Sequence, residues 1–148
     1  MPKGNGNIYQ AARKAAGLTQ EAAAERLAVS DTSIRAYESG ERLPGDDIVA
    51  RMITVYDAQY LGVQHLQLKP QLLPDCIMEV RPEPLPVAVI KLVRRVMAFA
   101  EQHRDDQLLE IAEDGVISDG EQPLFDEITG ELGDIVQAAL ALQYAEEA

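Results

Sequence analysis

The chain has 148 residues, of which 47% are hydrophobic and 5% aromatic, with a single Cys and two His. This composition excludes an internal disulfide and a zinc cluster of recognisable spacing, and no apolar run approaches the ~20 residues of a membrane span. The formal net charge is −12, but residues 1–58 carry seven basic against eight acidic side chains (−1), while the chain from residue 86 onward carries four against fourteen (−10). We therefore predict a cytoplasmic protein with no membrane contact, no metal and no cofactor, whose acidity belongs to its C-terminal part.

Capping residues and helical spacing predict four short helices in the first part of the chain. Thr19 and Ser30 are good N-caps because their hydroxyls can accept hydrogen bonds from the exposed N–H groups of a first turn. Asn5 and Asn7 can cap the first helix in the same way, and Gly17 and Gly40 are suited to end a helix. Apolar residues recur at helical spacing between these signals, so helices are expected up to residue 16 and over residues 20–28, 31–38 and 46–58.

Prolines interrupt any long helix between residues 66 and 86, where five of them occur at positions 70, 74, 82, 84 and 86. We expect a domain boundary here, with a first domain over residues 1–68, a Pro-rich linker over residues 69–85 and an acidic helical region over residues 86–148. Residues 76–80 could pair as a strand or pack on a surface, and we expect a loop there.

Three helices are predicted after the linker, starting near Val87, Gln107 and Phe125. The first carries two neighbouring apolar rows, a width that needs several packing partners. The last places apolar residues at alternating steps of three and four, an a/d-like seam formed by Phe125, Ile128, Leu132, Ile135, Ala139 and Leu142. This seam is a candidate dimer contact, and packing within the chain against the row of Ile90 is an equal alternative. Gly130 and Gly133 mark either a close helix approach or a kink.

Residues 18–44 carry an ordered set of motifs. They combine Leu-Thr-Gln at the start of the second helix, Leu-Ala-Val-Ser at the turn, Ile34 at a core position and Tyr-Glu-Ser-Gly at the end of the third helix. With this combination, residues 8–66 resemble the phage-repressor, or Xre/Cro-type, helix-turn-helix family. The resemblance implies a lambda-repressor-like helix-turn-helix domain in this part of the chain. Together with the helical spacing of the C-terminal region, it predicts an all-α protein in which this domain precedes a small C-terminal helical module. It also implies a sequence-specific, double-stranded DNA-binding transcriptional regulator of phage or bacterial type that acts as a homodimer.

The resemblance further implies which residues meet DNA, with the third helix in the major groove. Gln20 is expected beside a phosphate, Asp31 can accept a hydrogen bond from cytosine N4, and Arg42 would hold a phosphate. Carried over position by position, the DNA-binding set is Thr19, Gln20, Ser30, Asp31, Thr32, Ser33, Arg35, Ala36 and Arg42.

The same family pairs an arginine of the first helix with the glutamate of the Tyr-Glu-Ser-Gly segment. The resemblance therefore implies a structural ion pair between Arg13 and Glu38. The sequence departs from the family at two positions, because Ala23 stands where a larger Leu is usual and Ala28 stands where Gly often makes the turn.

Other interpretations carry less weight. A protein-interaction adaptor with the same fold that has lost DNA binding is the alternative function, and no small-molecule effector is identified. An enzyme is not expected, since no nucleophile, base and orienting group emerge together. Residues 114–121 are similar to the second half of a calcium-binding loop, but the first half lacks its ligands, so we expect a plain capped loop. His65 and His103 lie near helix ends, where we expect either a solvated side chain or a favourable contact with the helix dipole, and no metal.

Overall fold

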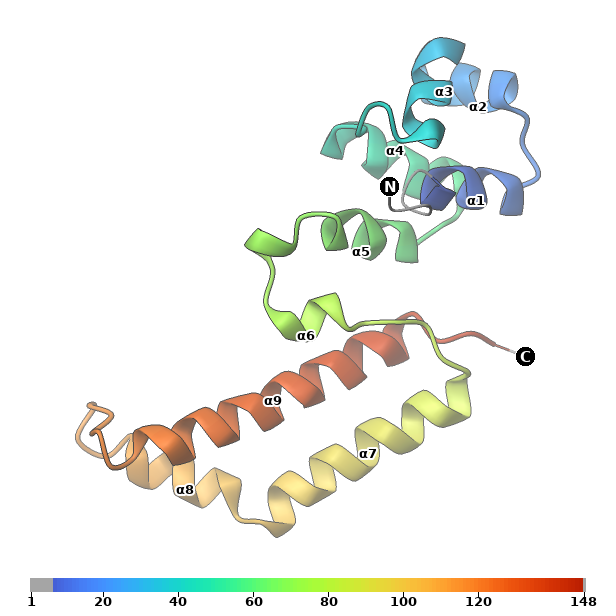
Figure 1. The fold of residues 1–148 in the computed structure, drawn as a ribbon. Helices are drawn as coiled ribbons and strands as arrows, with labels where there is room; N and C mark the ends of the chain where they lie inside the picture. Colours follow the sequence, from blue (N-terminus) through green and yellow to red (C-terminus); the bar gives the residue numbers. More distant parts are fainter. Residues whose placement is uncertain (1–6, 148) are drawn as a thin grey trace. The chain divides into compact units, whose positions relative to one another are not determined.

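The computed structural model describes residues 7–147, and its contacts divide the chain into two compact units that meet between Leu73 and Pro74 (Figure 1). The predicted all-α class is confirmed, because the described residues form helices and no strand, apart from one isolated bridge between Pro84 and Glu146. Within this range no helix has both the length and the apolar character to cross a membrane. Asn5, a suggested helix cap, lies outside the described residues.

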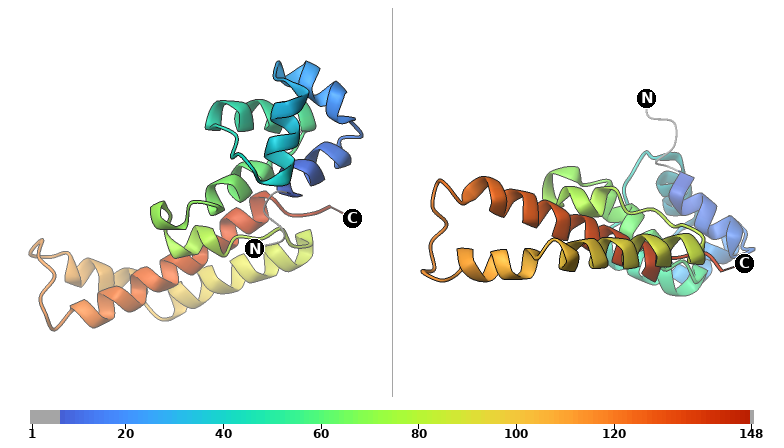
Figure 2. Two further views of the ribbon diagram at one scale, coloured as in Figure 1. Left: turned by 45° about the horizontal axis from the view of Figure 1, so that its top comes forward. Right: turned by 90° about the horizontal axis from the view of Figure 1, so that it is seen from below.

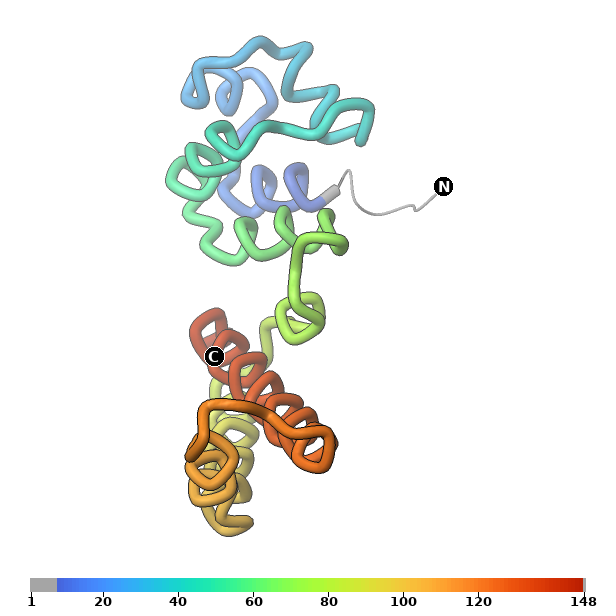
Figure 3. The backbone as a smooth tube through the Cα atoms, turned by 90° about the vertical axis from the view of Figure 1, so that its left-hand side faces the viewer, coloured from blue at the N-terminus to red at the C-terminus, as the bar shows by residue number. Residues whose placement is uncertain are grey.

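The described part of the first unit, from residue 7 onward, contains five α-helices, whose path is followed most easily in Figure 3. Thr19 and Ser30 cap the second and third helices as expected, since the hydroxyl oxygens accept from the N–H groups of Ala22 and Ser33, each at 3.1 Å. The helices are α1 (Asn7–Ala15), α2 (Gln20–Leu27), α3 (Asp31–Ser39), α4 (Asp46–Tyr56) and α5 (Tyr60–Gln67).

One apolar core holds these five helices together. Leu27, Ile34, Met52 and Leu61 are at most 1% exposed, so four different helices contribute side chains to the same interior. Ala23, which stands where the family usually has a larger residue, is fully buried at 0% exposure. A core of this kind supplies most of the free energy of folding of a small helical domain.

His65 is not solvated, because its side chain is buried at 2% exposure. Its Nδ1 lies 2.8 Å from the hydroxyl of Tyr9, and its Nε2 lies 3.0 Å from a carboxylate oxygen of Asp46. Lys69 also donates to that oxygen, at 3.1 Å. The hydrogen bonds from His65 and Lys69 lower the pKa of Asp46. This chain of contacts ties α1, α4 and α5 to one another, and it satisfies a polar group that would otherwise be costly to bury.

The proline-rich segment is more ordered than a plain linker. It contains a 3₁₀ turn, η1 (Pro70–Leu72), and a short helix, α6 (Asp75–Met78). The expectation of a loop over residues 76–80 was therefore wrong, and Val80 at the end of this stretch is 0% exposed. Pro74 precedes α6 and so does not interrupt it, because a proline lacking an N–H is tolerated where a helix begins.

The second unit is built on two long antiparallel helices, α7 (Leu85–Glu101) and α9 (Gln122–Gln143), which lie side by side in Figures 1 and 2. The short α8 (Arg104–Ile111) packs on both. Arg104 fixes it to α9, since its guanidinium donates to Glu127 at 2.7 Å and to Glu131 at 2.8 and 3.1 Å. These carboxylates raise the pKa of Arg104.

One of the two glycines of α9 lies next to α6. A Cβ added at Gly133 would lie 3.7 Å from Cβ of Cys76, whereas one at Gly130 would meet nothing within 4 Å. A distance of 3.7 Å is an ordinary van der Waals contact, so α6 packs against α9 at Gly133, but this packing does not require a glycine. Gln137, one turn later, donates from its side chain to the carbonyl of Glu79 at 3.1 Å.

The apolar seam expected on α9 is divided between the interior and the surface. Ile128 is fully buried, while Ala139 is exposed. The other four residues are partly buried: Phe125, Leu132, Ile135 and Leu142.

Candidate nucleic-acid interface

The segment from α2 to α3 forms a tight helical corner. α2 ends at Ala28, whose φ of 55° lies in the left-handed region that favours glycine. The N–H of Ala28 bonds back to carbonyls of α2, and two residues later Ser30 caps α3. The short turn fixes the direction of α3 relative to α2, which is the arrangement that presents a helix to a DNA groove.

The helix α3 has one buried face and one free face. Ile34 and Tyr37 are 1% and 7% exposed and point into the core. Asp31, Thr32 and Arg35 are exposed, and their side chains make no hydrogen bond or ion pair within the described part of the chain. Three polar side chains in the first turns of one helix are therefore available to a ligand.

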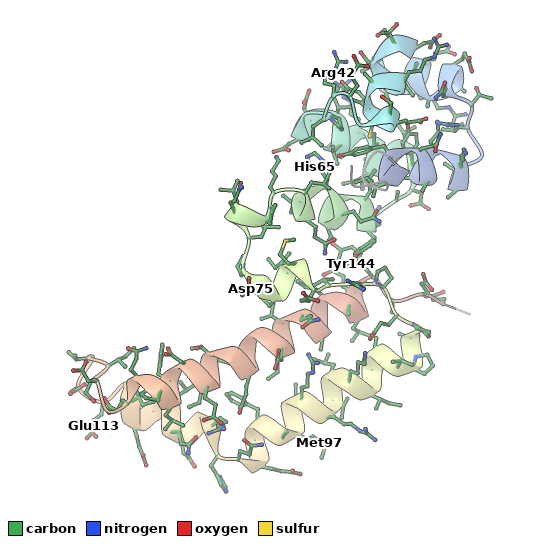
Figure 4. All side chains as sticks on the ribbon, in the orientation of Figure 1. Arg42, His65, Asp75, Met97, Glu113 and Tyr144 are labelled. Atoms are coloured by element: carbon green, nitrogen blue, oxygen red, sulfur yellow. The ribbon has the colours of Figure 1, made fainter. Side chains whose placement is uncertain are left out.

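A small polar network includes Ser30 and Ser33 of the same region and Arg42, which is labelled in Figure 4. Nη2 of Arg42 donates to Oγ of Ser33 at 2.7 Å, and Ser33 is hydrogen-bonded in turn to Oγ of Ser30 at 3.0 Å. The guanidinium of Arg42 also lies over the ring of Tyr37, 5.0 Å from its centroid. Arg42 remains exposed, so its positive charge is held beside α3 while still open to solvent.

The ion pair between Arg13 and Glu38 is present and buried. Nε and Nη2 of Arg13 donate to the two carboxylate oxygens of Glu38 at 2.5 and 3.0 Å, a bidentate geometry. Nη1 of Arg13 donates to the carbonyl of Leu18 at 2.7 Å. Burial opposes the charge on Glu38, but hydrogen bonds from Arg13 and Gln20 outweigh it and lower the pKa of this carboxyl. The pair connects α1 to the end of α3 and to the residues just before α2.

Gln20 belongs to this network as well as to the expected DNA-binding set. Its side-chain amide donates to Oε2 of Glu38 at 2.9 Å. One of its two amide hydrogens is thus used within the domain, and the second is left for another acceptor. Thr19 next to it is exposed, with its hydroxyl oxygen occupied as the N-cap of α2.

The loop over residues 114–121, which is similar in sequence to the second half of a calcium-binding loop, has a structural role. The hydroxyl and the N–H of Ser118 both donate to Oε2 of Glu121, at 2.6 and 2.9 Å. These bonds lower the pKa of Glu121. Asp114 accepts from the N–H of Val116 at 2.9 Å. The two carboxylates therefore shape the loop before α9, and no side chain caps the start of this helix.

The comparison with protein families agrees with this geometry. Residues 10–66 match the family model described as a helix-turn-helix domain. The matched residues include α2, the turn and α3, and they end before the second unit begins. No curated protein and no solved structure matches the chain. The first unit is therefore a helix-turn-helix domain, the kind of domain that DNA-binding regulators carry.

Proposed function

We propose that this protein is a transcriptional regulator of bacterial or phage type that binds double-stranded DNA sequence-specifically through α3. The observation that carries the proposal is the free face of α3, where Asp31, Thr32 and Arg35 stand exposed at the start of a helix whose opposite face is locked into the core. The major groove admits one α-helix and is read by the side chains near its N-terminus.

Each side chain on this face suits a particular contact. Arg35 can donate to guanine O6 and N7, the commonest specific contact in the major groove. Asp31 can accept from cytosine N4, and its charge disfavours bases that offer only acceptors. Ala36, half-buried beside them, can contact a thymine methyl group.

A second group of side chains would fix the position of the domain on the phosphates. Arg42 is held in place by Ser33 and Tyr37, so little side-chain entropy is lost when it meets a phosphate. The free amide hydrogen of Gln20 and the N–H groups at the start of α2 can donate to another phosphate. The same group of phosphate-contacting residues includes Thr19, Ser30 and Ser33.

We further propose that two copies bind together. The first 58 residues carry seven basic against eight acidic side chains, so one domain gains little from general attraction to phosphates. Two domains on half-sites one helical turn apart multiply both affinity and specificity.

A mobility shift on fragmented genomic DNA, titrated with salt, tests the proposal. The wild type should give a shift that weakens as salt rises. Arg35→Ala should weaken binding by roughly 5–150-fold, the cost of about 1–3 kcal/mol for one bidentate base contact. Arg81→Ala, at an exposed arginine of the second unit, is the matched control and should leave binding unchanged.

The outcome that contradicts the proposal is equally clear. If the folded protein gives no shift even at low salt, the domain serves protein contacts and the adaptor function holds. Circular dichroism of each variant verifies that the helices are intact.

A further inference from the structure

The second unit leaves a wide apolar surface uncovered. Val89, Ile90, Val93, Val96 and Met97 of α7 and Val136 of α9 are each 40–54% exposed. With the exposed Ala139 of α9 they form what we call the bare face. In Figure 4, Met97 lies on the side of α7 that faces away from α9. No charged residue belongs to this set.

Helix geometry places the two halves of the bare face on the same side of the α7–α9 pair. On α7, Val89, Val93 and Val96 each follow a buried or partly buried residue by a single position, as Val89 follows Ala88, which is 1% exposed. Ile90 and Met97 lie next to Val93 on the helix surface, three residues before it and four residues after it. On α9, Ala139 follows Ala138, which is 5% exposed. One residue is a rotation of about 100° in an α-helix. Because α7 and α9 run antiparallel, equal rotations in the direction of the chain lead to the same side of the pair.

The opposite side of α9 is already covered by α6. Gly133 lies against Cys76, and Gln137 bonds to the carbonyl of Glu79. Gly133 lies about 60° around the helix from Val136 and about 120° from Ala139, and Gln137 lies about 100° and 160° from the same two residues. The pair of long helices is therefore packed on one side and open on the other.

We propose that the bare face is the surface on which a second copy of this chain docks, so that two α7–α9 pairs form a four-helix bundle. The first argument is area. The six side chains that are 40–54% exposed present on the order of 500 Å² of apolar surface. A standard interface buries about 800 Å² per partner, of which about 65% is apolar in homodimers. The apolar area of the bare face is therefore roughly the apolar area that one partner buries in a stable dimer.

The second argument is symmetry. A two-fold contact requires a patch that complements itself. The apolar positions of α7 are symmetric about Val93, since Ile90 and Val96 lie three residues to either side and Val89 and Met97 lie four. When α7 meets its copy antiparallel at Val93, apolar side chains face apolar side chains along the whole contact. The exposed charged residues Arg94 and Glu101 lie at the edge of the bare face, four residues after Ile90 and Met97 respectively.

This inference rests on the proposed function only for the use of the dimer on DNA, and pairing is measured without DNA. Sedimentation equilibrium should give twice the chain mass of 16.2 kDa. Added salt should tighten pairing because each copy carries a net charge of −12, whereas it weakens DNA binding. A dimer that binds no DNA would overturn the proposed function alone, and a monomer at about 100 μM, far above the micromolar range of specific interfaces, would overturn the dimer.

Val93→Glu locates the contact. It should raise the Kd for pairing by more than about 100-fold, because a buried carboxylate would lack a partner. Val116→Glu is the matched control, at a loop valine that is 64% exposed, and should still pair. A folded Val93→Glu protein that remains dimeric would place the contact elsewhere and overturn the assignment.

A crosslink provides a second test that does not depend on destabilising the surface. With the native thiol removed by Cys76→Ser, Val93→Cys should form a disulfide-linked dimer on mild oxidation, because the two-fold axis brings the two thiols together. Val116→Cys in the same background is the control. Crosslinking at Val93 no faster than at Val116 would overturn the proposal.

Discussion

The two units of this protein use their apolar residues in opposite ways. Among the described residues, eleven buried core side chains belong to the first unit and six to the second. Of the large hydrophobic side chains that stay exposed, three belong to the first unit and eleven to the second. The helix-turn-helix domain has a complete core of its own, while the α7–α9 pair has only one of its sides covered. A change in the first unit should therefore alter folding, and a change on the bare face should alter association.

The largest expected effect comes from breaking the buried ion pair of the first unit. Glu38→Gln leaves the guanidinium of Arg13 buried without its counter-charge, since the side chain of Arg13 is 8% exposed. We expect the free energy of unfolding of this unit to fall by about 3–5 kcal/mol. Urea unfolding followed by circular dichroism measures it. The double variant Arg13→Met with Glu38→Met should lose less, and an additive loss would contradict this explanation.

A comparable effect separates the two units directly. Leu27→Ala removes a side chain that is 0% exposed and should cost about 2–5 kcal/mol at any protein concentration. Val96→Ala, at a position that is 47% exposed, should leave the stability of the single chain nearly unchanged and weaken pairing instead. Unfolding at several protein concentrations distinguishes these results. If both variants lower stability equally in dilute protein, the contrast between the units is wrong.

The effect of pH on the stability that the Arg13–Glu38 ion pair provides should be smaller than the effects of these substitutions. The pKa of Glu38 is lowered in the folded protein from its ordinary value of 4.5, so its contribution to stability is complete above that pH. It is lost as the pH falls through the lowered folded pKa. Thermal unfolding between pH 6 and about 3 should show this decline. Glu38→Gln should show a flatter profile, and identical profiles would exclude Glu38 as the source.

The smallest effect concerns the turn between α2 and α3. Ala28 occupies a left-handed conformation, with φ at 55°, which costs an L-residue about 1–2 kcal/mol. Ala28→Gly removes this strain but adds freedom to the unfolded chain, a loss of about 0.4–1 kcal/mol. A net gain of roughly 0.5–1 kcal/mol should appear in the same urea experiment. Ala22→Gly within α2 is the control and should instead destabilise.

Features decided by neighbouring residues could be predicted from the sequence. Thr19 and Ser30 predict the starts of α2 and α3, because a capping hydroxyl accepts a hydrogen bond from an N–H group only two or three residues away. The ion pair of Arg13 and Glu38 was accessible only through the family resemblance, since 25 residues separate the partners. The free face of α3 followed from helical spacing once α3 was recognised.

Features decided by distant contacts were missed. The burial of His65 depends on Tyr9, which lies 56 residues earlier in the chain, so no local pattern reveals it. The short helix α6 lies among prolines that predict a loop, and it packs on α9 through Gly133. The apolar seam of α9 was visible in the sequence, but its division between interior and surface depends on where α7 and α6 lie.

The bridge between Pro84 and Glu146 gives the last few residues of the described chain an unexpected importance. The N–H of Leu85 donates to the carbonyl of Glu146 at 3.1 Å, and the N–H of Glu146 donates to the carbonyl of Glu83 at 2.9 Å. These two hydrogen bonds hold the start of α7 against the residues that follow α9. Truncation of the chain after Tyr144 would remove both hydrogen bonds to Glu146 and should destabilise the start of α7, the helix that carries most of the bare face.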